Sequence, residues 1–313
     1  MTKPIEDKLD KIPILNLLVR LLKKIKLPGL EGLSLYDLME LYITGIVKGA
    51  LTTRASAIAF SFFTAIFPFL LFILIVIPYI PVENFQAEFL AFLESFLPPQ
   101  TSDFFFKSIF ENISDNSSHG GLLSSVFVLS ILLMANGISA IFSGFESSYH
   151  EQLTRNVFKQ YLYALGVALI LAFLLILTVA IFGYFEIYVI DNLYDSLQKK
   201  GYAIGSYVIW VTLAKYMFFI IMVYLTTATL YYFGTKEGKS SRFFSIGALF
   251  TTLLIILISY LFGIYIVKFS KYNELYGSIG ALLILLFYLW LNSNIILLGY
   301  ELNASLNRLK KGF

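Results

Sequence analysis

Long apolar runs separated by short polar segments cover most of the chain, which has 313 residues. A helix needs about 20 apolar residues to cross a hydrocarbon layer that is roughly 30 Å thick. The runs that are long enough predict transmembrane helices over about residues 55–80, 121–145, 161–187, 204–233, 243–267 and 277–303. The pattern therefore predicts an all-α membrane protein with a six-helix transmembrane domain over residues 51–308.

The segment before the first span has an amphipathic pattern instead. Residues 14–26 combine leucine and isoleucine with lysine and arginine, which predicts a short basic helix at the anionic membrane surface. Packing of this helix on the protein itself is the alternative. Ser34 and Asp37 match the S-x-x-D helix start and predict a second interfacial helix that runs to about Ala50. We assign residues 1–50 to a cytoplasmic or interfacial segment.

A polar and aromatic segment, residues 82–120, separates the first two spans. Phenylalanines recur every three or four residues between positions 85 and 96, which places them on one face of a helix. The Pro98-Pro99 pair interrupts the segment, and neither half is long enough to span a bilayer. We therefore expect an amphipathic helical hairpin at the outer interface. At the other end of the chain, residues 309–313 form a cytoplasmic tail.

The end of the sixth span carries a distinctive motif. It reads LGYELNA over residues 298–304 and follows an apolar run that begins at YGS, residues 276–278. The first span begins with RASAIAFS over residues 54–61 and contains Phe67-Pro68. These segments resemble the last and first helices of the YihY/BrkB family, and the resemblance extends over about residues 34–308.

The resemblance implies an integral protein of the prokaryotic cytoplasmic membrane. It implies a location and a fold rather than a reaction. One position departs from the family pattern, which has an aromatic pair where this chain has Phe60-Ser61.

Composition and charge support the membrane class and set an orientation. The chain is 58% hydrophobic and 14% charged, whereas soluble domains carry about 25% charged residues, and its mean hydropathy is +0.79. With the N-terminus inside, 17 of the 23 Lys and Arg residues lie in inner segments, 5 in outer segments, and Lys215 within a span. Cytoplasmic loops carry the excess of basic residues. We therefore expect a multi-pass protein of the cytoplasmic (inner) membrane with both termini in the cytoplasm.

The N-terminus is polar over its first 13 residues and lacks the apolar core of a signal peptide, so we expect it to be retained. No cysteine is present, which excludes a disulfide, a thiolate nucleophile and a Cys-ligated metal.

Polar residues recur at helical spacing on four of the spans. They are Arg54, Ser61, Thr64 and Pro68 on the first span, Asn136, Ser139, Ser143 and Glu146 on the second, Thr212, Lys215, Thr226 and Thr229 on the fourth, and Asn294, Glu301 and Arg308 on the sixth. One interpretation is a polar interior that these spans share, with a hydrated cavity or substrate path. The other is close helix packing through small and hydroxyl residues. Proline inside a membrane helix usually causes a kink, so Pro68 predicts one in the first span.

Lys215 is the most unusual single residue. It lies eleven residues into its predicted helix, or roughly 16 Å from the outer end at 1.5 Å per residue. A lysine at this depth is expected to meet a carboxylate, carbonyls or water, and Glu186 is one candidate partner. The alternative is a lysine whose amine extends to a lipid headgroup.

Charged residues also collect near the inner boundary, where Arg54, Glu146, Glu301 and Arg308 lie within about two helical turns of the cytoplasm. We predict that Glu301 pairs with Arg54 or with a neighbouring backbone N–H. Such a pair has two interpretations, an inner gate or a static clamp that fixes the first helix against the sixth.

Several functions are excluded by what the chain lacks. Proteins that resemble it have carried a ribonuclease label, and RNA hydrolysis needs a histidine–carboxylate site or a metal cluster. The two histidines, His119 and His150, fall on opposite sides of the membrane in the predicted topology. No metal-ligand cluster and no phosphate-binding G-x-x-x-x-G-K-[ST] loop is present. We expect no enzyme activity, no catalytic residue, no metal, no cofactor and no nucleic-acid partner.

The sequence therefore favours a transporter, exporter or flippase-like protein for an amphiphilic or small organic substrate. Its expected partners are membrane lipids and this substrate, and the sequence is compatible with a homo-oligomer. The residues expected to form the substrate path or gate are Arg54, Pro68, Asn136, Glu146, Lys215, Asn294 and Glu301. The alternative is a non-transporting structural or envelope-organising membrane protein, in which the same polar faces only hold helices together.

Overall fold

The computed structural model of the chain describes residues 13–26, 34–37, 39–40, 50–76, 120–146, 156–184, 204–234, 243–269 and 278–310. Its helices are α2 (Pro13–Lys24), α4 (Leu51–Val76), α8 (Gly120–Glu146), α9 (Val157–Tyr184), α11 (Ile204–Gly234), α12 (Ile246–Phe269) and α14 (Ser278–Lys310). Of the helices in these ranges, the last six are long and apolar enough to cross a membrane. This confirms the predicted class, an all-α protein with six transmembrane helices. The predicted outer hairpin lies outside the described residues except for its last residue, and Glu186 also lies outside them.

The helix ends agree with the predicted ones to within four residues, except that α14 continues seven residues beyond residue 303. This extension is polar in sequence but stays helical because Leu302 and Leu306 on one of its faces are buried. At the other end of the transmembrane domain, Ala50 adopts a positive φ of 46°. Directly after this left-handed residue, α4 begins at Leu51 and carries Arg54 in its first turn.

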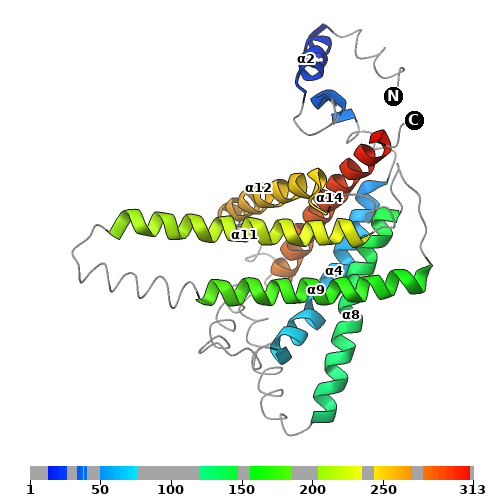
Figure 1. Cartoon of the computed structure of the whole chain (residues 1–313), viewed down its shortest axis with the longest axis vertical. Helices are drawn as coiled ribbons and strands as arrows, with labels where there is room; N and C mark the ends of the chain where they lie inside the picture. Colours follow the sequence, from blue (N-terminus) through cyan, green and yellow to red (C-terminus); the bar gives the residue numbers. More distant parts are fainter. Residues whose placement is uncertain are drawn as a thin grey trace.

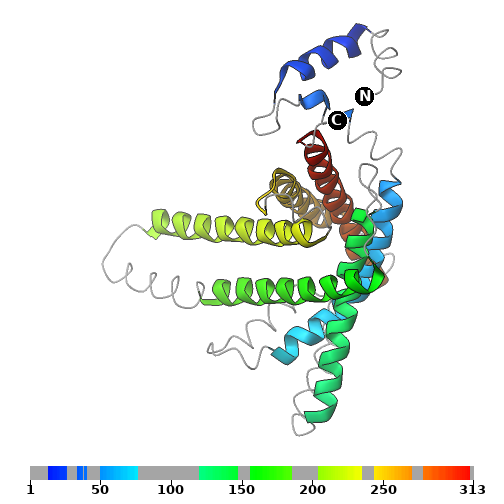
Figure 2. The same cartoon turned by 45° about the vertical axis from the view of Figure 1, so that its right-hand side comes forward.

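The six spans contact one another in a closed cycle. Each packs against the next one in the chain, α4 on α8, α8 on α9, α9 on α11, α11 on α12 and α12 on α14, and α14 returns to α4. In Figures 1 and 2, α8 leaves the common region in one direction, whereas α9 and α11 leave it together in another. The helices are therefore joined at one end and separate toward the other.

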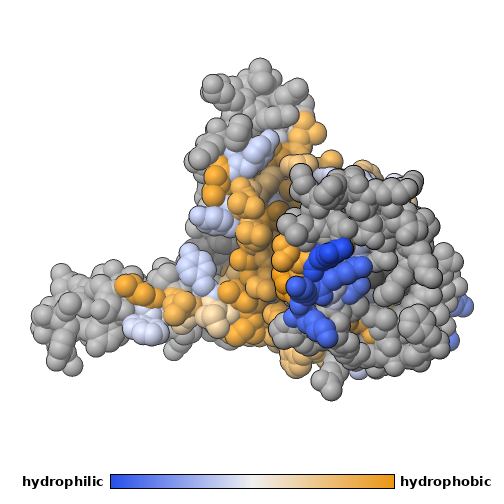
Figure 3. All heavy atoms as spheres, turned by 90° about the horizontal axis from the view of Figure 1, so that it is seen from above, coloured by the Kyte–Doolittle hydropathy of each residue, from blue (hydrophilic) through white to orange (hydrophobic). Residues whose placement is uncertain are grey.

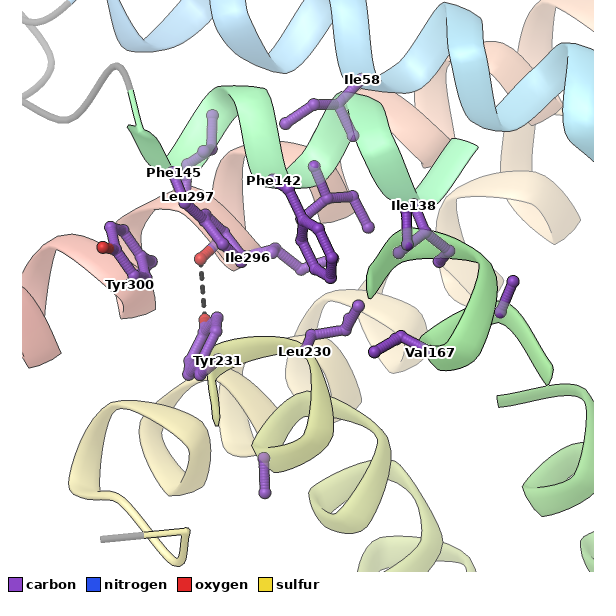
Figure 4. Packing of buried hydrophobic residues seen from close by; sticks show 14 of the residues in the cluster. Ile58, Ile138, Phe142, Phe145, Val167, Leu230, Tyr231, Ile296, Leu297 and Tyr300 are labelled. Carbon is purple, nitrogen blue, oxygen red and sulfur yellow. Dashed lines mark hydrogen bonds between the residues drawn. The ribbon is translucent and has the colours of Figure 1, made fainter. Parts of the chain in front are cut away.

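The hydrophobic core lies where the helices are joined. Its largest fully buried side chains include Phe142 and Phe145 at the end of α8, Ile58 near the beginning of α4, and Leu297 in the second half of α14. Figure 4 shows these side chains packed together with Leu230 of α11 and others. Because consecutive spans alternate in direction, this joined end is the one that the basic residues predict to be cytoplasmic.

Away from the core, the spans expose large apolar side chains. On α11 these are Ile209, Trp210, Leu213, Tyr216, Met217, Phe219 and Ile221. Hydrophobic residues also extend over much of the described surface in Figure 3. Apolar surface of this extent is typical of helices that face lipid.

The helix start predicted at Ser34 is present. The Ser34 backbone N–H donates to Asp37 Oδ2 (2.8 Å), and the Asp37 N–H donates to Ser34 Oγ (3.3 Å). These reciprocal bonds form a capping box and confirm the S-x-x-D prediction. Residues 41–49 lie outside the described residues, so the length of the second interfacial helix stays a prediction.

Candidate functional site

The candidate site is built around the motif that ends the sixth span. Its five central residues, 299–303, lie on successive positions of α14 and therefore point in different directions around the helix axis. Four of them, Gly299, Tyr300, Glu301 and Asn303, contact neighbouring helices as the following paragraphs describe. The motif thereby joins α14 to α4, α8, α11 and α12 at one level of the protein.

Glu301 pairs with the first transmembrane helix. Its Oε1 lies 3.0 Å from a terminal nitrogen of Arg54, and the two side chains are 2% and 10% exposed. The other terminal nitrogen of Arg54 donates to the Gly144 carbonyl of α8 (2.8 Å). This confirms the predicted Glu301–Arg54 pair and adds a third helix to it. We call the Arg54 guanidinium, the Glu301 carboxylate and the Gly144 carbonyl the clamp.

The position of the Gly144 carbonyl explains why an arginine is favoured here. Gly144 lies in the last turn of α8, which ends at Glu146, and the last four carbonyls of a helix lack intrahelical donors. The C-terminal end of a helix also carries partial negative charge. A planar guanidinium has several donors and can bond a carboxylate and a carbonyl at the same time. Arg54 therefore binds one full and one partial negative charge.

Tyr300 packs in the aromatic part of the core. Its ring stacks on Phe145 of α8, with 4.2 Å between ring centroids and 14° between planes. The neighbouring Tyr231 of α11 donates its hydroxyl to the Ile296 carbonyl (2.7 Å), the bond drawn in Figure 4. The Tyr231 hydroxyl also lies 2.6 Å from Thr251 Oγ1 of α12. These bonds tie α11 and α12 to α14 inside the core.

Gly299 allows this close approach of three helices. A Cβ at this position would fall on Thr251 Oγ1, with the Tyr231 hydroxyl and the Gly247 carbonyl next to it. Gly247 is equally tight, because a Cβ there would fall on the Gly299 carbonyl and the Asn303 side chain. Small residues at such crossings let helix backbones approach in membranes.

Asn303 caps the beginning of α12. Its Oδ1 accepts from the backbone N–H of Gly247 (2.8 Å), and its Nδ2 donates to Ser245 Oγ (2.8 Å). Gly247 lies in the first turn of α12, where backbone N–H groups lack intrahelical acceptors. Asn303 thus supplies from α14 a bond that α12 cannot make for itself.

Asn303→Leu should therefore destabilise the protein by about 1–3 kcal/mol, since the buried Gly247 N–H would lose its acceptor. Asn303→Asp should cost less, because a carboxylate oxygen can still accept from that N–H at a helix N-terminus. Thermal unfolding of the purified protein in detergent measures both changes. Asn292→Leu is the matched control, because Asn292 donates to the Tyr288 carbonyl of its own helix. Equal losses for Asn303→Leu and Asn292→Leu would contradict the capping role.

The polar face of α8 meets α9 rather than a shared interior. In the amide orientation that satisfies both of its polar atoms, Gln160 of α9 donates to Glu146 Oε2 (3.2 Å) and accepts from Ser143 Oγ (2.9 Å). Asn136 of the same face is exposed. Of the two interpretations of the polar faces, these contacts favour helix packing over a shared polar interior at α8. The physical reason is that the apolar face of α8, which carries Phe142, is the face buried in the hydrophobic core.

The remaining candidates do not join the clamp. Tyr231 of α11 bonds α14 about one turn from the clamp. Lys215 lies 16 residues before Tyr231 on the same helix, which is about 24 Å along the helix axis. Asn294 donates to the Trp290 carbonyl of its own helix (2.7 Å). Pro68 lies inside α4, which continues on both sides of it. The structure thus brings together Arg54 and Glu301 but not the whole predicted set.

The sequence interpretation missed Tyr231, Thr251, Asn303 and the Gly144 carbonyl. Glycines inside apolar spans were the available signal for the first three, because Gly247 and Gly299 mark a close approach. No side-chain pattern predicts a backbone carbonyl as the second acceptor for Arg54.

Comparison with known proteins places these features in a wider group. The family model described as Virulence factor BrkB matches residues 43–312. The chain is 26% identical over 264 residues to the ribonuclease-like protein YfkH of Bacillus subtilis (strain 168), which covers 83% of this chain and 91% of that protein. It is 30% identical over 105 residues to the UPF0761 membrane protein IL2447 of Idiomarina loihiensis (strain ATCC BAA-735 / DSM 15497 / L2-TR), covering 33% and 34%. No solved structure matches the chain.

Proposed function

The chain belongs to the virulence factor BrkB family of membrane proteins, and we propose that it is a transporter, exporter or flippase-like protein for an amphiphilic or small organic substrate. The observation that supports this proposal is the clamp, a buried ion pair that closes the cycle of six helices at their joined end. In this proposal Arg54 and Glu301 form a gate that is closed in this structure, at the end that we place in the cytoplasm.

A buried ion pair is better suited to a contact that opens than to a static structural contact. Taking two charges out of water offsets much of their attraction, so well-packed apolar residues often stabilise a protein as well or better. Among the described residues, Arg54 also keeps a buried Nε without a hydrogen-bond partner. An unsatisfied buried donor costs about 1–3 kcal/mol, and this cost would be relieved when the pair meets water or a charged ligand. The clamp can therefore open at a smaller cost than the apolar core around it.

The proposed substrate class follows from the other end of the helices. There the spans separate, and their exposed side chains are apolar or aromatic, as on α11. Such surfaces suit an acyl chain or another apolar group. Lys215 lies in the same half of α11 and would attract an anionic group of the same molecule.

A second candidate, a non-transporting structural or envelope-organising protein, rests on a different observation. Many hydroxyl and amide side chains in the spans bond carbonyls of their own helix four residues earlier. Examples are Thr178 on Leu174, Thr229 on Leu225, and Ser293 on Leu289. Side chains satisfied in this way need neither water nor substrate, as expected of a dry bundle.

Reconstitution distinguishes the two candidates. We expect purified protein in phosphatidylcholine vesicles to accelerate leaflet exchange of fluorescent, short-chain phosphatidylglycerol over protein-free vesicles. Replacing the pair by Arg54→Met with Glu301→Leu should keep the protein folded, because both charges leave together, but should slow exchange if opening the clamp is required. Unchanged exchange by this folded variant would identify a static clamp, and no exchange by the wild-type protein would favour the organising role. Thermal stabilisation by lipids and metabolites extends the search to soluble substrates.

Lys215→Met should abolish exchange of an anionic lipid and leave expression and thermal stability unchanged. The reason is that Lys215 lies 16 residues of α11, or about 24 Å along the axis, from Tyr231, whose hydroxyl bonds α12 and α14. Leaflet exchange and the unfolding temperature are measured on the same preparation. Thr226→Val on the same helix serves as an uncharged control. Wild-type exchange by the Lys215 variant would exclude the role that we give to this lysine.

We also propose that the chain is not an enzyme and that it lies in the cytoplasmic (inner) membrane with both termini inside. The ribonuclease-like name belongs to the Bacillus subtilis relative. Within the described ranges, no three His, Cys, Asp or Glu residues are grouped to hold a metal, while His119 and His150 lie outside them. The orientation rests on the excess of basic residues in the inner segments. Incubation of the purified protein with labelled RNA tests the first point.

A further inference from the structure

We propose that α2 and the segment after it form a docking surface for anionic lipid headgroups, with two apolar side chains inserted into the bilayer beside them. This surface is separate from the clamp and does not depend on the proposed transport function. The residues that form it are Arg20, Leu21, Lys24, Ile25 and Lys26.

The apolar part of this surface is exposed without a membrane. Leu21 in the last turn of α2 is 55% exposed, and Ile25, the first residue after the helix, is 49% exposed. Basic side chains lie beside them in the chain. They are Arg20 and Lys24 in the last turns of α2 and Lys26 after it, and all three are exposed. From above, Figure 3 shows one group of strongly hydrophilic residues next to hydrophobic ones.

The opposite side of α2 is held by the protein. Lys23 Nζ lies 4.9 Å from the centre of the buried Tyr36 ring, a cation–π contact. The Leu35 N–H donates to the Ile25 carbonyl (2.9 Å), next to an isolated bridge between Lys26 and Ser34. The last two contacts pair the backbone of Ile25 and Lys26 and leave their side chains exposed. The Lys23 contact lies on the side of α2 away from Leu21.

The next contact fixes where these exposed side chains lie. Leu35 packs against Leu302 and Leu306, the buried leucines at the end of α14, together with Ile246 and Phe250 of α12. Because α14 is a transmembrane helix, the segment that carries α2 is attached at the end of a span, where the bilayer surface begins. An exposed apolar stripe between basic residues at that level matches the interfacial type of amphipathic helix.

Charge selects the partner. The bordering residues are all cations, and the surface of a membrane that contains anionic lipid attracts them within about one Debye length. A soluble protein partner would not account for two exposed apolar side chains at the level of the bilayer surface. The chemistry therefore points to phosphate-bearing lipids of net negative charge.

The absence of cysteine from the chain allows a direct test on the full-length protein. Leu21→Cys and Ile25→Cys each receive an environment-sensitive fluorophore, and the labelled protein is placed in nanodiscs of phosphatidylcholine with zero to one half phosphatidylglycerol. We expect a blue shift and protection from aqueous iodide that increase with phosphatidylglycerol. A label at Lys23→Cys, on the side of α2 that is held by Tyr36, should stay accessible to iodide throughout.

Neutralising the basic border should remove this dependence. The variant that neutralises the border carries three substitutions in the labelled Leu21→Cys protein: Arg20→Gln, Lys24→Gln and Lys26→Gln. We expect partitioning of its labelled segment into the anionic bilayer to be about a hundredfold lower. Lys159→Gln, at an exposed site on α9, should change nothing. Equal protection in pure phosphatidylcholine, protection by inorganic phosphate alone, or protection that rises with protein concentration would each overturn the proposal. The first result would indicate packing on neutral lipid or on the protein itself. The second would indicate a site for free phosphate, and the third a contact with a second copy of the chain.

Discussion

Glu301→Ala should lower the free energy of unfolding by about 3–5 kcal/mol, because Arg54 would keep its buried charge without the carboxylate that neutralises it. The loss should be large for a single substitution, since the Arg54 side chain is only 10% exposed and its charge has little access to water. Denaturant titration in detergent micelles measures the free energy, and thermal unfolding gives the order of the variants. Arg54→Ala should be similarly damaging, because it removes both the ion pair with Glu301 and the hydrogen bond to the Gly144 carbonyl.

The double variant Arg54→Met with Glu301→Leu is the internal control for this result. It removes both charges, so most of the loss should be recovered, apart from about 1 kcal/mol for the Gly144 carbonyl. Arg20→Ala removes an exposed arginine and should have little effect on stability. If Glu301→Ala and the double variant were equally unstable, the loss would come from packing and the ion pair would contribute little.

Gly299→Ala should be the most damaging change of a single methyl group in the described part of the chain. The new Cβ would fall on Thr251 Oγ1 and next to the Tyr231 hydroxyl. Overpacking of this kind costs about 1–3 kcal/mol, and the bonds from Tyr231 to Thr251 and Ile296, at about 1 kcal/mol each, would be disturbed as well. We expect lower yield of monodisperse protein and a lower unfolding temperature.

Gly263→Ala provides the matched comparison, because nothing lies within 4 Å of a Cβ at that position. Gly263 also lies inside a transmembrane helix, α12, so the effect of alanine on helix propensity is shared by both variants. Alanine is favoured over glycine in a helix by about 0.5–1 kcal/mol, and Gly263→Ala should therefore be neutral or slightly stabilising. Tolerance of alanine at both positions would mean that the helices can separate at Gly299 at little cost.

The sequence was sufficient for the transmembrane helices because the bilayer imposes a length that can be counted. A helix must keep its backbone bonds internal and its side chains apolar over the whole hydrocarbon thickness. The resulting apolar runs define the six spans almost to their ends. The S-x-x-D start at Ser34 was equally readable, because a capping box uses residues three apart and needs no distant partner.

The Glu301–Arg54 pair was also predictable, since two opposite charges near the same boundary of the bilayer are both costly until they meet. The sequence by itself therefore determined the spans and the local helix start, and it limited the predicted partner of Glu301 to Arg54 or a backbone N–H. Only the tertiary structure decided the cyclic order of the helices, the bond from Arg54 to Gly144, the contacts of Tyr231 and Asn303 with neighbouring helices, and the separation of Lys215 from the clamp. Helical periodicity tells which residues share a face but not which helix that face meets. That choice depends on how large side chains such as Phe142 and Phe145 pack against the glycines of neighbouring spans.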